Sequence, residues 1–263
     1  MTTYYAGCDV GSTTGKAVIL SDSGLVAGAI CNSKIDPEIT AREALDAAMA
    51  QVPDLHSMQD LACIVGTGYG RTHVPFAHEN VSEISCHALG AHFCDPSIRT
   101  IVDIGGQDVK AIAVNEDGTV REFAMNDKCA AGTGRFFEAM SRTFDMSLKE
   151  FSELSLSAKK ITPVTAQCSV FAETEVVSLI SKRHPPADIA AGIQTAVAKR
   201  VFSLARRVGV QPSATVTGGC AKNAGLLKAL ARVLRVDIVV IDTDPQLAGA
   251  LGAAVFARRR ANS

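Results

Sequence analysis

The chain has 263 residues, a formal charge of −1 and 47% hydrophobic residues, which suits one sizeable globular domain or two small ones. Basic residues are spread along the chain and tryptophan is absent, so we expect no nucleic-acid partner. The N-terminal stretch has no signal-peptide pattern and no apolar run approaches the ~18 residues of a membrane span, so we expect a cytoplasmic protein without a membrane partner.

The chain contains an internal duplication. The segment Cys8–Val26 aligns without a gap on Val102–Val120, at an offset of 94 residues. The identical pairs are Asp9 and Asp103, Gly11 and Gly105, Lys16 and Lys110, Ala17 and Ala111, Gly24 and Gly118, and Val26 and Val120. Each copy predicts three strands joined by glycine-containing turns, followed by a helix. We therefore expect an α/β protein made of two similar halves with a ligand cleft between them.

Other elements follow from periodicity and from turn residues. In chain order they are a helix at 37–52, a strand at 61–66, a helix at 83–93, helices after Cys129 and after Cys168, a helix at 187–209, a strand at 214–218, a helix at 224–234, a strand at 236–242 and a helix at 246–259. The long helix at 187–209 repeats its apolar residues every three or four positions until Gly209 ends it.

The two glycine turns predict a phosphate site. In GSTTGK, residues 11–16, backbone N–H groups and hydroxyls can surround a phosphate, and Lys16 adds a positive charge. The sequence continues as a strand, so this is not a Walker A loop. Asp9 and Asp103 end equivalent strands and could hold a hydrated Mg²⁺. Two ordinary hairpins remain the alternative interpretation at this point.

The segment TGGCAKN, residues 217–223, adds a third piece, in which Gly218 and Gly219 follow a buried strand and could lie close to a purine or its ribose. These pieces resemble the two phosphate motifs and the adenosine motif of the actin, heat-shock chaperone and sugar-kinase superfamily. The resemblance implies an actin-like ATPase fold of two ribonuclease H-like halves with a nucleotide cleft, and hinge closure on ATP. We expect residues 1–97 plus 245–263 to form the first half and residues 98–244 the second.

Eight cysteines are present and no CxxC pair occurs, so one chain does not supply a four-cysteine metal site by spacing. Cys129 and Cys168 each precede a predicted helix, whose N-terminus favours the thiolate. Two thiols per chain are too few for an iron–sulfur cluster, but a symmetric dimer would supply four. Buried packing cysteines are the alternative.

Several segments resemble the ATP-dependent activator of 2-hydroxyacyl-CoA dehydratases, a member of the BadF/BadG/BcrA/BcrD ATPase family that includes ATPase subunits of benzoyl-CoA reductase. The segments are GCDVGSTTGKAVIL, TGYGR, EISCHALGA, VDIGGQDVKAI, MNDKCAAGTGRFFEAM, CSVFAETEVVS, TGGCAKNAG and QLAGALGAA, and they span nearly the whole chain. The resemblance implies that Cys129 and Cys168 bind one [4Fe-4S] cluster per homodimer. It also implies ATP or ADP contacts from Gly11, Ser12, Thr13, Thr14, Lys16, Gly105, Gly106, Gln107, Gly218, Gly219, Asn223 and Gln246.

The mechanism implied by this resemblance is ATP-driven electron transfer. Ferredoxin or flavodoxin would reduce the cluster, and the electron would pass to a dehydratase or reductase component. Asp103 would order Mg²⁺, together with Asp9, while Gln107 or Asp108 would position the hydrolytic water.

Two other interpretations remain. Cys86, His87, His92 and Cys94 lie close together in sequence and suggest zinc, but their spacing on a helix does not bring four ligands to one point. A small-molecule kinase of the same superfamily, similar to pantothenate kinases, is the alternative function. It would need an acceptor pocket with a general base and would have no use for two cysteines before helices.

Overall fold

The computed structural model describes residues 2–165 and 168–263. The chain divides into two compact units, one made of Met1–Ser97, Val114–Arg121 and Ile241–Ser263, the other of Ile98–Ala113 and Glu122–Val240. This division differs from the predicted boundaries in two places. It assigns the segment Val114–Arg121 to the first unit, and the chain returns to the first unit at Ile241 instead of at residue 245. Each unit contains one five-stranded sheet, and the two are described separately below.

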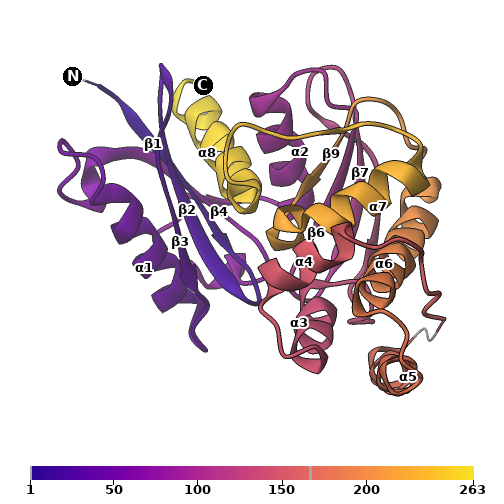
Figure 1. Cartoon of the computed structure of the whole chain (residues 1–263). Coiled ribbons are helices and arrows are strands. Elements are labelled where there is room, and N and C mark those ends of the chain that lie inside the picture. The colour runs from indigo at the N-terminus through magenta and orange to yellow at the C-terminus, as the bar shows by residue number, and fades with distance from the viewer. Residues whose placement is uncertain (1, 166–167) are drawn as a thin grey trace. The chain divides into compact units, whose positions relative to one another are not determined.

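The first unit is a sheet covered by helices on both faces. Its elements are β1 (Tyr4–Val10), β2 (Thr14–Ser21), β3 (Gly24–Asn32), α1 (Pro37–Met49), η1 (Met58–Asp60), β4 (Leu61–Thr67), η2 (Arg71–His73), β5 (Glu79–Asn80), α2 (Glu83–Cys94), η4 (Pro245–Leu247) and α8 (Ala248–Ala261). The strand order is β3-β2-β1-β4-β5. Helices α1 and α8 lie on opposite faces of this sheet, and α2 packs on α8 (Figure 1).

The core of the first unit follows from strand alternation. Tyr5 of β1 belongs to the apolar cluster beneath α2 and α8, whereas Ala6 and Cys8 belong to the cluster beneath α1. Since successive side chains of a strand point to opposite faces, β1 needs apolar residues at nearly every position. Helix α1 begins where Asp36 accepts a hydrogen bond from the backbone N–H of Glu38, with Pro37 in the first turn.

The second unit repeats the strand order of the first. Its elements are β6 (Thr100–Ile104), β7 (Val109–Val114), β8 (Val120–Asn126), α3 (Gly134–Thr143), α4 (Leu148–Leu156), α5 (Ser169–Ser181), α6 (Pro186–Val208), β9 (Ala214–Thr217), η3 (Gly219–Lys222), α7 (Ala224–Leu234) and β10 (Ile238–Val239). The order β8-β7-β6-β9-β10 matches β3-β2-β1-β4-β5 strand for strand. In both sheets the first and second strands are antiparallel, and the fourth is parallel to the first. The predicted duplication is confirmed.

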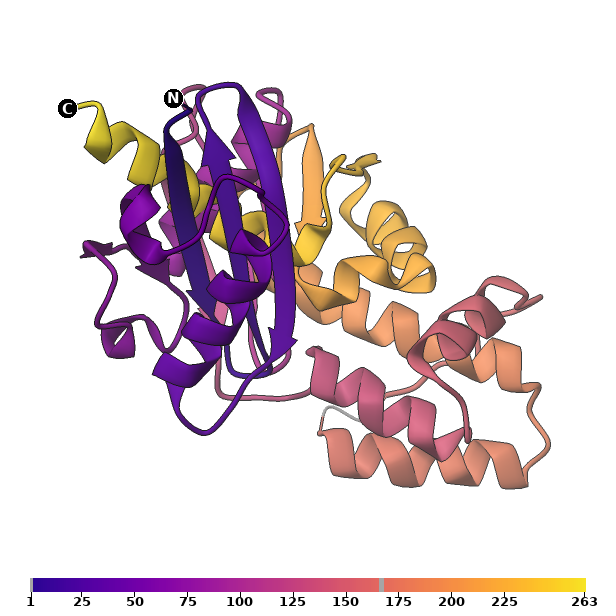
Figure 2. The same cartoon turned by 90° about the vertical axis from the view of Figure 1, so that its left-hand side faces the viewer.

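The second unit differs in the long connection between β8 and β9. Helices α3, α4, α5 and α6 all lie in this connection, and α3 and α5 run side by side (Figure 2). Helix α4 was not predicted. Its start carries a capping box, in which Ser147 and Glu150 exchange side-chain and backbone hydrogen bonds, and this pattern is visible in the sequence.

Two predicted elements need correction. The strand predicted at 236–242 is only β10, Ile238–Val239, and Val240 is 76% exposed, so the apolar run there does not continue along the sheet. The helix predicted at 246–259 begins as η4, and α8 starts at Ala248. Within residues 2–165 and 168–263, no helix combines the length and apolar character needed to cross a bilayer.

Candidate functional site

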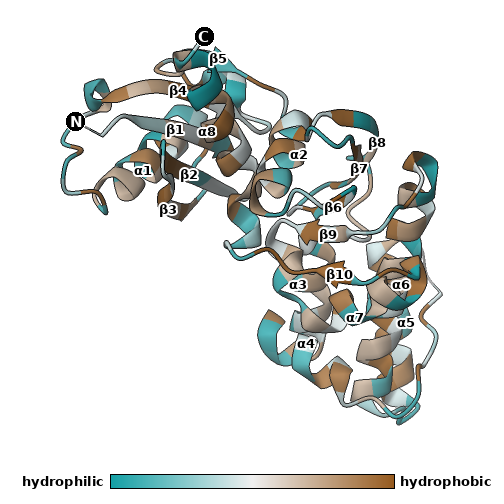
Figure 3. Cartoon of the chain, turned by 90° about the horizontal axis from the view of Figure 1, so that it is seen from above, coloured by the Kyte–Doolittle hydropathy of each residue, from teal (hydrophilic) through white to brown (hydrophobic). Residues whose placement is uncertain are grey.

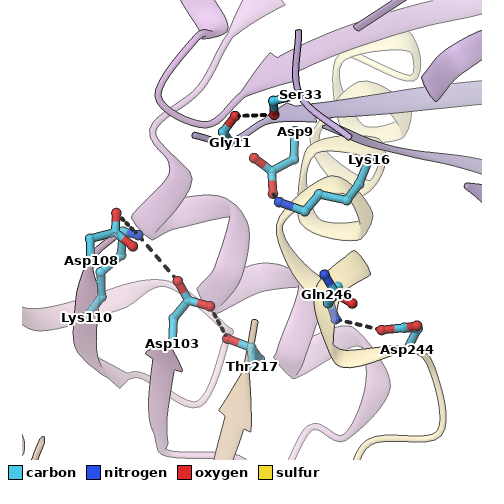
Figure 4. A network of polar contacts seen from close by, with 10 residues as sticks. All are labelled: Asp9, Gly11, Lys16, Ser33, Asp103, Asp108, Lys110, Thr217, Asp244 and Gln246. Atoms are coloured by element: carbon cyan, nitrogen blue, oxygen red, sulfur yellow. Dashed lines mark hydrogen bonds and ion pairs between the residues drawn. The ribbon is translucent and has the colours of Figure 1, made fainter. Parts of the chain in front are cut away.

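The turn between β6 and β7 carries a buried polar network in the second unit (Figure 4). Asp103 and Lys110 are cross-strand partners, and each is 3% exposed. Lys110 Nζ lies 3.3 Å from Asp103 Oδ2 and 2.8 Å from Asp108 Oδ2. Thr217 of β9 donates a hydrogen bond of 2.8 Å to Asp103 Oδ1. The network orients two carboxylates and one ammonium group beside the Gly105–Asp108 turn.

The first unit contains the equivalent pair. Asp9 and Lys16 are cross-strand partners, with Lys16 Nζ 3.4 Å from Asp9 Oδ2. A Cβ atom added at Gly68 or at Gly249 would collide with this carboxylate, so both glycines let the backbone approach it closely. Two of the predicted site residues, Asp9 and Lys16, therefore lie together within the first unit.

The turn after β1 is closed by local hydrogen bonds. Gly11 N–H donates to Thr14 O, and Ser33 Oγ donates 2.7 Å to Gly11 O. Among the residues that the structure describes, Thr13 Oγ1 is buried and has no hydrogen-bond partner. A buried hydroxyl in this state is costly unless a ligand atom satisfies it. The turn therefore fits a phosphate oxygen beside Thr13.

The predicted adenosine motif borders the network of the second unit. Gly218 has φ +81°, and a Cβ atom there would lie 2.9 Å from Asp103 Oδ1. Asn223 caps α7, accepting a hydrogen bond of 3.0 Å from Leu226 N–H, and it exchanges amide hydrogen bonds with Gln194 of α6. Its side chain therefore holds the loop after Gly219 in place. In the first unit, the backbone N–H of Gln246 donates to Asp244, which caps η4.

Cys129 lies in an exposed loop between β8 and α3. It stands five residues before Gly134, where α3 begins, so Cys129 is not a capping residue of that helix, and the favouring of its thiolate by the N-terminus of α3 stays a prediction. Gly134 N–H donates 2.9 Å to Gly105 O, and Arg135 N–H donates 3.0 Å to Gly106 O. A Cβ atom on Gly134 would lie 3.3 Å from Gly105 O. The start of α3 is thus hydrogen-bonded to the Gly105–Asp108 turn.

Cys168 is the N-cap residue of α5, and its thiol is also exposed. Helix α5 packs against α3 and α6. Arg200 of α6 stacks over the ring of Phe136 in α3, with Cζ 5.6 Å from the ring centroid. Burial lowers the pKa of the Arg200 guanidinium, and the charges of Cys129 and Cys168 act in the opposite direction. Arg200 could not be identified from the sequence, because its contact with Phe136 depends on how α6 packs against α3.

The four residues of the possible zinc site all lie in α2. Burial raises the pKa of the Cys86 thiol to about 12 and that of Cys94 to about 11. His87 is also buried, and its Nε2 lies near Asp9 Oδ2, since a Cβ atom on Gly249 would be 3.0 Å from the first and 2.8 Å from the second. Within the described residues, no group of three His, Cys, Asp or Glu side chains could hold a metal ion.

Comparison with known proteins agrees with this geometry. The chain is 44% identical to an activator of lactoyl-CoA dehydratase from Anaerotignum propionicum over 254 residues, which are 97% of each chain. The crystal structure of the Acidaminococcus fermentans (R)-2-hydroxyglutaryl-CoA dehydratase component A superposes with a TM-score of 0.94 at 40% identity, covering 99% of this chain and 100% of that one. An activator of the 2-hydroxyisocaproyl-CoA dehydratase from Clostridium difficile with bound ADPNP gives 0.91 at 41% identity, covering 100% and 96%.

These similarities confirm the predicted actin-like ATPase fold. The family model described as the BadF/BadG/BcrA/BcrD ATPase family matches residues 6–257, which is nearly the whole chain. ATP turnover and ATP or ADP binding follow from this membership. The chain belongs to the BadF/BadG/BcrA/BcrD ATPase family.

Proposed function

We propose that this ATPase activates a 2-hydroxyacyl-CoA dehydratase, or a related iron–sulfur reductase, by passing it one low-potential electron. Full-length similarity to activators of such dehydratases supports the choice of partner. The observation that carries the mechanism is the pair of hydrogen bonds from the start of α3 to Gly105 and Gly106. They connect a turn suited to phosphate with the segment that bears Cys129.

We propose that ATP binds as a magnesium complex. Asp9 and Asp103 would hold the hydrated ion, and their ion pairs with Lys16 and Lys110 keep the carboxylates oriented until phosphate arrives. The phosphates would be contacted by the two glycine turns, which consist of Gly11, Ser12, Thr13 and Thr14 in the first unit and Gly105, Gly106 and Gln107 in the second. The nucleoside site would be formed or supported by Gly218, Gly219, Asn223 and Gln246. Gln107 is exposed, whereas Asp108 is held by Lys110, so we assign the water-positioning role to Gln107.

We propose further that Cys129 and Cys168 of two chains bind one [4Fe-4S] cluster, which supplies a one-electron carrier. Both thiols are exposed and lie beside α3 and α5, two helices that pack together. A second copy would supply the remaining two thiolates and cover the exposed apolar residues of α5, a helix whose ribbon includes hydrophobic segments (Figure 3). Those exposed side chains are Val170, Phe171, Val177 and Ile180.

Nucleotide binding would then affect the thiols by moving the segments that carry them. We propose that residues 1–97 plus 245–263 and residues 98–244 close on ATP as two bodies, and that the Gly105–Asp108 turn moves the start of α3 with it. Lowering an effective potential by ~300 mV requires on the order of 7 kcal/mol for one electron, which nucleotide binding and hydrolysis can supply. Ferredoxin or flavodoxin would be the electron donor. Eight thiols suit the reducing conditions of the cytoplasm, where we place the protein.

The test is anaerobic purification followed by iron and sulfide analysis and an ATP-dependent dehydration assay with a dehydratase component. We expect a brown dimer with about four iron atoms, as a single shared [4Fe-4S] cluster requires. We also expect the dehydratase to become active only with ATP and a reductant. A colourless protein that phosphorylates a metabolite would replace this proposal with the kinase alternative. If the rate of electron transfer were the same with and without ATP, the proposed coupling between nucleotide and cluster would be refuted, but the proposed cluster would stand.

A further inference from the structure

Arg200 occupies a restricted position between two helices of the second unit. It belongs to α6, and its guanidinium stacks on Phe136, the third residue of α3. Phe136 is 1% exposed, and Nη1 of Arg200 is shielded from solvent. Stacking on a buried ring holds a guanidinium in one place far better than solvent does. The positive charge of Arg200 is therefore held fixed between α6 and α3.

The two exposed thiols lie beside the ends of helices that pack around this charge. Thr133, which precedes α3, donates its N–H and its hydroxyl to the carbonyl of the residue after Cys129, so this turn holds Cys129 close to the start of α3, where Phe136 lies. Cys168 caps α5, which packs against both α3 and α6. The electrostatic effect of both thiols on Arg200 agrees with this placement. Helices α3, α5 and α6 therefore bring one fixed cation and two potential thiolates into the same three-helix cluster.

We propose that Arg200 is a positioning residue of the cluster, whose fixed charge favours the reduced state. This inference rests on the proposed function, since it requires the cluster. Four thiolates give such a group a net negative charge, and one-electron reduction makes it more negative. A positive charge in a partly desolvated place therefore raises its reduction potential, and charge and burial are established determinants of that potential. Each subunit of a dimer contributes one Arg200, which keeps the cluster reducible by its donor protein.

The experiment compares Arg200→Gln and Arg200→Lys with Arg206→Gln in the anaerobic dimer. Arg206 is a matched control, because it lies on the same helix and stacks over Phe202 at 5.8 Å. Iron content is measured first, and then the cluster is titrated at controlled potentials with an electron paramagnetic resonance readout. In R200Q we expect the ratio of reduced to oxidised cluster at a fixed potential to fall about tenfold, which is ~59 mV for one electron. R200K keeps the charge, so it should stay close to wild type, and R206Q should match wild type.

An iron-loaded R200Q dimer with the wild-type midpoint potential overturns the inference. If R200Q loses iron, R200K decides: a loaded R200K dimer with a near-wild-type midpoint supports the role of the charge, whereas loss of iron from R200K as well, with R206Q still loaded, overturns it. A wild-type protein that binds no cluster overturns the proposed function and this inference together. If the wild-type dimer binds the cluster and R200Q has the same midpoint potential, the role of Arg200 is refuted while the proposed function stands.

Discussion

The two hairpins of the duplication share a register but differ in what surrounds them. Asp9 faces Lys16 in the first unit, and Asp103 faces Lys110 in the second. The first turn is braced by Ser33 of the following loop, and the helix after its hairpin, α1, has no cysteine. The second turn accepts hydrogen bonds from the start of α3, close to an exposed thiol. The same backbone pattern thus occurs in both units, and only in the second is it hydrogen-bonded to the segment that carries a proposed cluster ligand.

The largest effect should come from the exposed thiols of the second unit. Cys129→Ser or Cys168→Ser removes one of the two ligands that each chain contributes, so we expect the iron content of the anaerobic dimer to fall from about four atoms to nearly none. Cys31→Ser, in the first unit, should keep the full iron content. If both the Cys129→Ser and the Cys168→Ser dimers retained their iron, the proposal that these two cysteines bind the cluster would be wrong.

In protein without metal, the rate of thiol modification should distinguish the exposed Cys129 and Cys168 from the buried cysteines. Burial raises the pKa of Cys8, Cys86 and Cys220 to about 12, so at pH 8 about one in ten thousand of each is thiolate. Cys129 and Cys168 are exposed and should react at least a thousandfold faster with a thiol reagent at that pH. Mass spectrometry of partly labelled protein identifies the fast sites. Rapid labelling of Cys220 would contradict the burial described for the second unit.

The lysines should differ in their contribution to stability. Lys110→Met leaves the buried Asp103 without its ammonium partner and should cost about 3 kcal/mol of unfolding free energy. Lys16 is slightly more exposed and holds one buried carboxylate at 3.4 Å instead of two, so Lys16→Met should cost less, about 2 kcal/mol. Urea denaturation measures both. Equal losses would mean that the two hairpins are energetically equivalent.

The smallest effect concerns the hydroxyls that support each hairpin. Thr217→Val removes the donor to Asp103 Oδ1 and should cost about 1.5 kcal/mol, because a buried carboxylate oxygen loses a hydrogen bond. Ser33→Ala removes a bond from a partly exposed hydroxyl to Gly11 O and should cost about 0.5 kcal/mol. Thermal unfolding of both variants provides the measurement. A larger loss for S33A would reverse the order of the two hairpins.

The repeat made most of the fold predictable. An alignment of two segments correctly predicted that the same hairpin occurs twice, with Asp9 equivalent to Asp103 and Lys16 equivalent to Lys110. The end of α6 at Gly209 was also predicted correctly, since the apolar period stops there. The short length of β10 was not predictable, because apolar residues at 238–241 look the same whether or not a neighbouring strand pairs with them.

The site was predicted less completely than the fold. Gly134 and Thr217 contact the second turn from elements that lie about 30 and 110 residues further along the chain, and no local pattern records such contacts. In the sequence, Arg200 cannot be distinguished from other polar residues of an amphipathic helix, because only the folded structure shows its contact with Phe136. The position of Cys129 relative to α3 also depends on where the helix begins, and helix ends are set by capping contacts rather than by periodicity.

The connection between β8 and β9 holds every residue proposed here to bind or tune iron. The strands on either side of it keep the same order as their counterparts in the first unit, where the corresponding connection contains a single α-helix. A longer crossover can therefore carry the proposed electron-carrying module on an ATP-binding framework while the strand order of the sheet stays the same. Descendants of the same framework could exchange that module for another and keep their nucleotide chemistry.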